Sequence, residues 1–164
     1  MPADKLVDPI VTISDYGTSF VVATERSPEL HTPALYLPPE DFFKEPITQA
    51  ADIWTLAVNL YEVLEFFEPD GSWVRNIKRI YTPVFRPLHQ RMWDMGRGET
   101  PESCQWDMKG GEMQALEELL RDMMAFEPAE RLMAEQLMKS EYMVKWAMPA
   151  WERQLERRKG QGLE

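Results

Sequence analysis

The most apolar stretch of the chain, Thr48–Leu64, predicts a helix at the centre of the fold. Its apolar residues cover most of the circumference at 3.6 residues per turn, and a helix of this kind is normally surrounded by the rest of its domain. Thr48 is a candidate N-cap. Asp52, Asn59 and Glu62 interrupt the run, which also falls short of the roughly 20 apolar residues of a membrane span. We therefore expect a buried core helix and no membrane segment.

The rest of the chain predicts further helices and few strands. Leucine and methionine at helical spacing predict an amphipathic helix over Glu112–Phe126. Short β-prone runs predict strands at Val11–Ile13 and Phe20–Ala23, and the prolines between residues 24 and 39 predict a long loop. Shorter helices are expected over Pro87–Met95, Leu132–Ser140 and Pro149–Lys159, with a turn over Tyr142–Trp146. The predicted fold class is mainly α.

Composition narrows the class of protein. The 164 residues, 44% of them hydrophobic, are expected to form one globular domain. A formal net charge of −10 argues against binding to nucleic acid or to an acidic membrane, and leaves room for a basic partner. The only cysteine, Cys104, cannot form an intrachain disulfide, and the first residues have no apolar signal core. We therefore expect an intracellular protein, cytoplasmic or nuclear.

Three stretches, in this order, resemble the C-terminal lobe of a eukaryotic protein kinase. V-T-I-S-D-Y-G, ending at Gly17, is similar to the strand and D-F-G motif, with Tyr16 in place of Phe. Y-L-P-P-E, ending at Glu40, is similar to the Y-x-A-P-E close of the activation segment, and D-I-W at Asp52 to the D-x-W start of the central helix. L-L-R-D-M-M-A-F-E-P-A-E-R, ending at Arg131, is similar to a late helix and its D-P-x-x-R loop.

The resemblance covers about Val11–Trp146, and residues 51–64 look most like fungal kinases related to the serine/arginine-rich-protein kinases. It implies a kinase-like C-lobe fragment, mainly α, with a central buried helix and one or two short N-terminal strands. The expected domains are an N-terminal tail (1–10), a partial kinase domain (11–146) with an internal deletion after residue 64, and a charged C-terminal helix or tail (147–164).

The resemblance also implies roles for individual residues. Asp15 corresponds to the ligand of the Mg²⁺ that bridges the ATP phosphates; taken alone, Asp-Tyr-Gly is an ordinary turn. Glu40 and Arg131 correspond to a buried ion pair, the alternative being two surface side chains. Asp52 corresponds to the carboxylate that anchors the catalytic loop, or it simply stabilises the helix N-terminus.

Further candidates lie on the expected activation segment. Tyr36 would help to form the wall that meets a substrate residue, the alternative being core packing. Three hydroxyl side chains could accept phosphate or be merely solvated: Thr24, Ser27 and Thr32.

Several parts that a kinase needs are missing from this sequence. It has no G-x-G-x-x-G loop and no H-R-D catalytic loop, and neither His31 nor His89 is followed by Arg-Asp. We therefore expect a truncated Ser/Thr protein kinase domain that is inactive and does not bind the family's ATP and Mg²⁺ by itself. Its protein substrate or partner would be basic and Arg/Ser-rich, and the fragment should expose apolar surface. The alternatives are a non-catalytic, pseudokinase-like interaction module and a truncated product with no role of its own.

Overall fold

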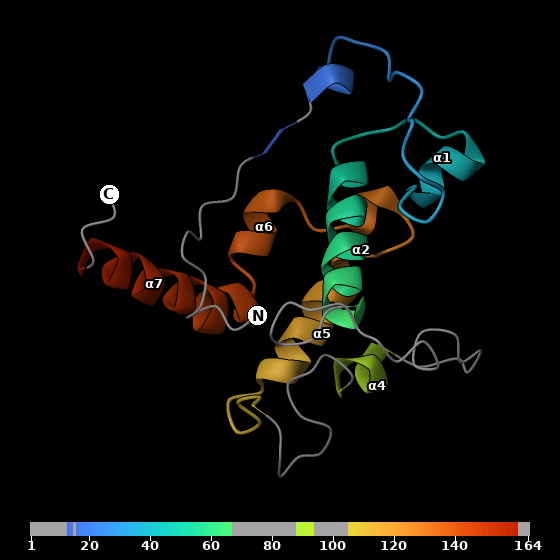
Figure 1. Ribbon diagram of the computed structural model, residues 1–164. Helices are drawn as coiled ribbons and strands as arrows, with labels where there is room; N and C mark the ends of the chain where they lie inside the picture. The colour runs from blue at the N-terminus through green and yellow to red at the C-terminus, as the bar shows by residue number, and fades with distance from the viewer. Residues whose placement is uncertain (1–12, 15, 67–87, 94–104, 161–164) are drawn as a thin grey trace.

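The structure, a computed structural model, describes residues 13–14, 16–66, 88–93 and 105–160 (Figure 1). This part of the chain is helical and contains no strand, so the predicted class, mainly α, is correct. In chain order the elements are η2 (Tyr16–Thr18), α1 (Pro39–Phe43), α2 (Ala50–Phe66), α4 (Leu88–Trp93), α5 (Glu112–Met123), η3 (Pro128–Glu130), α6 (Ala134–Met138), η4 (Met143–Ala147) and α7 (Met148–Gly160).

The central helix begins where the sequence indicates. The hydroxyl oxygen of Thr48 accepts a hydrogen bond from the Ala50 N–H at 3.2 Å. The Thr48 carbonyl accepts a second from the Ala51 N–H at 3.0 Å. Thr48 therefore satisfies two of the N–H groups that a helix start leaves without an intrahelical partner.

Over residues 50–61, whose side chains are described, the central helix is buried on one face only, which corrects the expectation of burial all round. Ile53 and Ala57 are buried in the core, whereas Leu56 and Leu60 are 47% and 41% exposed. The physical reason is that α2 makes its contacts with α5 and η3, which lie together against one side of the helix. Leu56 and Leu60 therefore leave apolar surface on the opposite side of α2.

The core lies where α2, α4 and α5 meet (Figure 1). Most of its side chains come from α5, because the leucine and methionine stripe of that helix points inward. The helix ends at Met123 rather than at Phe126, since Met124 already leaves the helical conformation. The buried core residues are Ile53, Ala57, Met92, Trp106, Met113, Leu116, Leu119, Leu120 and Met123.

The predicted strand at Phe20–Ala23 is wrong. This segment is a turn, in which the N–H groups of Thr24 and Glu25 donate to the Val21 carbonyl. β-Branched residues favour strands only where a neighbouring strand pairs with them, and the described residues supply none. Of the strand predicted at Val11–Ile13, Ile13 is described and is not in a strand, while the rest lies outside the described residues.

The remaining predicted helices are present as α4, α6 and α7. α6 is shorter than the predicted Leu132–Ser140, α7 is slightly longer than the predicted Pro149–Lys159, and the turn predicted over Tyr142–Trp146 is the helical turn η4. Sequence reasoning missed α1, which begins with Pro39 at its first position, where proline is favoured. An internal deletion was expected after residue 64. Most of the chain that would show it, residues 67–87, lies outside the described part.

A charged cluster joins α4 to α5. Glu117 accepts a hydrogen bond from Arg121 at 2.6 Å, and His89 Nδ1 lies 2.8 Å from its other oxygen. Partial burial acts to raise the pKa of Glu117, but the hydrogen bonds and charges of Arg121 and His89 outweigh it and hold that pKa below its usual value. The charged carboxylate therefore links the two helices.

A hydrogen-bonded turn leads into α5. Asp107 Oδ1 accepts from the Gly110 N–H at 2.8 Å, and the other oxygen of Asp107 accepts from Trp146 Nε1 at 3.3 Å. The Asp107 N–H donates to the Glu112 carboxylate at 2.8 Å. One carboxylate thus ties the start of α5 to η4.

Gly110→Ala should destabilise the protein, because a Cβ at this position would stand 2.0 Å from Asp107 Oδ2. Asp107 would have to abandon its bonds to Gly110 and Trp146, at a cost of about 1–3 kcal/mol. We expect thermal unfolding to shift down by several degrees. The matched control is Gly160→Ala, whose Cβ would meet nothing within 4 Å. Equal melting temperatures for the two variants would contradict this role of Asp107.

Candidate functional site

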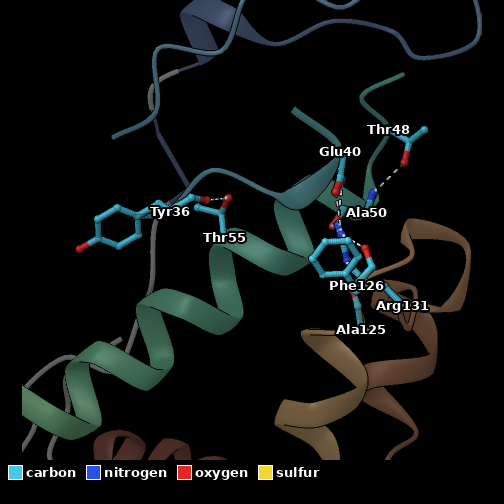
Figure 2. Close-up of polar contacts among 8 residues, drawn as sticks. All are labelled: Tyr36, Glu40, Thr48, Ala50, Thr55, Ala125, Phe126 and Arg131. Atoms are coloured by element: carbon cyan, nitrogen blue, oxygen red, sulfur yellow. Dashed lines mark hydrogen bonds and ion pairs between the residues drawn. The ribbon is translucent and has the colours of Figure 1, made fainter. Parts of the chain in front are cut away.

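Arg131 and Glu40 form a buried ion pair (Figure 2). Arg131 Nη1 donates to Glu40 Oε1 at 2.7 Å, and Nη2 donates to Oε2 at 2.6 Å. Both side chains are 0% exposed. Two parallel bonds from the planar guanidinium fix both the distance and the orientation of the carboxylate. The structure therefore brings together two residues that are 91 positions apart.

Arg131 also binds three backbone carbonyls. Its Nη1 donates to the Ala50 carbonyl at 3.0 Å, Nε to that of Ala125 at 2.7 Å, and Nη2 to that of Phe126 at 3.1 Å. A guanidinium has five N–H donors, so these three bonds and the two to Glu40 engage all of them. The sequence identified the carboxylate partner, but no side-chain pattern could have indicated the three carbonyls.

The hydrogen bonds of Arg131 hold three parts of the chain in one place. Glu40 belongs to α1, Ala50 is the first residue of α2, and the other two carbonyls follow α5 (Figure 2). The Arg131 guanidinium carbon also lies 5.1 Å from the centre of the Trp54 ring, close enough for a cation–π contact. Because its donors are engaged within the protein, Arg131 acts as a structural group and is not available to bind a phosphate.

The segment that precedes α1 is attached to α2 at Tyr36. Thr55 Oγ1 donates to the Tyr36 carbonyl at 3.3 Å, and the Tyr36 ring points away from α2 in Figure 2. Tyr36 and Thr32 are half-buried, as is Ser27, whose hydroxyl donates to the Pro28 carbonyl at 2.9 Å. Thr24 is exposed. The segment is therefore positioned near its end by α2 and by the Arg131 cluster.

Of the two candidate aspartates only Asp52 is described, and it is not among the hydrogen-bond partners of Arg131. Asp52 is exposed on the first turn of α2, where the free N–H groups of the helix favour a negative charge. Asp15 lies outside the described residues. Within the described ranges, no group of three or more His, Cys, Asp or Glu residues could hold a metal ion. Nor does any helix there have the length and apolar character to cross a membrane.

A comparison with protein families finds a match. The family model described as protein kinase domain matches residues 4–143, which is most of the chain. The matched range includes Glu40, Asp52 and Arg131. No curated protein and no solved structure matches the chain.

Proposed function

The chain belongs to the protein kinase domain family, and from this membership we propose that it represents the C-terminal lobe of a Ser/Thr protein kinase. The observation that carries the proposal is the buried Glu40–Arg131 pair, which joins two of the three stretches that resemble that lobe. Within the family we assign it to fungal kinases related to the serine/arginine-rich-protein kinases, on the sequence of residues 51–64.

We also propose that this 164-residue chain does not itself transfer phosphate. Phosphoryl transfer depends on groups that position ATP and on charges that stabilise the transferring phosphoryl. The chain has neither a Gly-rich loop nor an H-R-D motif, and Asp15 is its one residue at a family Mg²⁺ position. ATP and Mg²⁺ are therefore ligands of the family that this chain alone is not expected to bind.

A phosphorylation assay tests this proposal. Purified chain is incubated with labelled ATP, Mg²⁺ and Arg/Ser-rich peptides, beside the Asp15→Ala variant and an active kinase as positive control. We expect the chain and its variant to incorporate label only at the level of the enzyme-free blank. Turnover by the chain that Asp15→Ala abolishes would overturn the claim of inactivity and would leave the family membership intact.

A second candidate function is a non-catalytic interaction module that binds a protein partner. The exposed Leu56 and Leu60 on α2 favour it, because they offer apolar surface to a partner. The fluorescence of a polarity-sensitive dye should increase with the chain, and increase less with the Leu56→Ser, Leu60→Ser double variant.

We also propose an intracellular location, cytoplasmic or nuclear, which rests on Cys104 being the only cysteine of the sequence.

A further inference from the structure

Two phenylalanines whose rings are in contact, Phe43 and Phe126, form an exposed aromatic patch beside Arg131. Phe42 and Phe43 end α1 and are 60% and 63% exposed, and Phe126 follows α5 and is 58% exposed. The rings of Phe43 and Phe126 pack edge to face with their centroids 5.7 Å apart. We call Phe43 and Phe126 the phenylalanine patch. Aromatic side chains usually lie in a core or an interface, so their exposure needs a reason.

The buried Arg131 side chain holds the two parts of the patch in fixed positions. Arg131 binds the carboxylate of Glu40, which belongs to α1 like Phe43, and also the backbone carbonyl of Phe126. One buried side chain therefore fixes both halves of the patch relative to each other. A surface that is already ordered loses little conformational entropy when a ligand binds, which favours affinity.

The size of the patch suits a peptide better than a folded domain. Taking about 200 Å² for each phenylalanine, the exposed fractions of Phe43 and Phe126 correspond to about 240 Å² of aromatic surface. A stable interface between two folded proteins, including two copies of this chain, needs about 800 Å² on each partner. A short segment with two or three apolar anchors would cover the patch.

The charged residues that neighbour the patch in sequence are mostly acidic, which favours a basic partner. Asp41 and Glu45 lie within two residues of Phe43, and Glu127 and Glu130 within four residues of Phe126. Within residues 41–45 and 122–130, Lys44 is the only basic residue. Glu45, Glu127 and Glu130 are exposed, so they would attract lysine and arginine and repel nucleic acid or an acidic membrane.

We propose that the phenylalanine patch is a docking site for a basic peptide segment that carries apolar anchor residues. The anchors pack on Phe43 and Phe126, and flanking lysine or arginine side chains pair with the neighbouring carboxylates. The proposal does not depend on phosphoryl transfer, because these residues belong to none of the motifs that bind ATP or Mg²⁺.

The test uses the full chain and a fluorescein-labelled peptide of about a dozen residues, with two leucines and one phenylalanine among lysines and arginines, in about 0.15 M salt. Fluorescence anisotropy measures the Kd. We expect Phe43→Ala and Phe126→Ala each to weaken binding about tenfold. Leu35→Ala removes a side chain that is 79% exposed elsewhere and should leave the Kd unchanged. Thermal unfolding of each variant confirms that the fold persists.

Two variants with the same change in net charge distinguish docking at the patch from general electrostatic attraction. Glu127→Lys and Glu152→Lys change the net charge equally, but Glu152 lies on α7. We expect the first to weaken binding at least threefold more than the second. Equal losses, an unchanged Kd in the phenylalanine variants, or no binding at about 1 mM peptide would each overturn the proposal. So would a dimer in sedimentation that Phe126→Ala dissociates, because the patch would then be occupied by a second copy.

Discussion

Arg131→Ala should abolish cooperative unfolding or lower the free energy of unfolding by about 3–5 kcal/mol, because it leaves the Glu40 charge buried without a partner. The substitution also removes the donor that hydrogen-bonds to the backbone carbonyls of Ala50, Ala125 and Phe126. For a protein of this size the loss corresponds to a melting temperature lowered by roughly 10 °C.

Two further variants sharpen this prediction. Arg131→Lys keeps the charge but replaces a planar fork of five donors by three donors on one nitrogen, so we expect it to lose most of the same stability. Arg121→Ala, at an exposed arginine that pairs with Glu117 four residues away, is the control and should cost less than about 1 kcal/mol. Thermal and urea unfolding followed by circular dichroism measure all three. An Arg131→Ala curve within about one degree of the parent protein's would contradict the role of the pair.

Leu120→Ala should have the second largest effect. Leu120 is 0% exposed and lies in the core cluster with Ala57 of α2, which is also 0% exposed. Removing its side chain leaves a cavity between packed helices, and substitutions of this kind cost about 2–5 kcal/mol. The expected drop in melting temperature is roughly 5–15 °C.

The control for Leu120→Ala is Leu60→Ala, on the exposed side of α2. It removes the same atoms from a position where they contact solvent, and should change stability by no more than about 0.5 kcal/mol. Equal losses in the two variants would mean that the packing of α2 on α5 is not the core of this protein.

The sequence predicted those features whose signal is local. The run of apolar residues in α2 and the leucine and methionine stripe of α5 report helical periodicity directly, and Thr48 is a residue type that accepts bonds from helix N–H groups. Glu40 and Arg131 were selected by their motifs, since no periodic pattern relates two residues 91 positions apart.

Other features depend on the arrangement of the elements in space. Leu56 and Leu60 have the same hydrophobicity as buried leucines, so only the position of α5 shows that they are exposed. The residues Phe20–Ala23 favour a strand, but a strand needs a partner and the chain forms a turn there. The three carbonyls around Arg131 carry no sequence signal at all, because every residue has one.

The central claim is that Arg131 is a fully engaged, buried side chain that fastens α1, the start of α2 and the end of α5 together. NMR of the Arg131 guanidinium in ¹⁵N-labelled protein tests it most directly, with Arg121 as the exposed reference in the same sample. We predict separate, slowly exchanging Arg131 N–H signals that change on Glu40→Gln. Signals from Arg131 that exchange with water as fast as those of Arg121 would contradict the account.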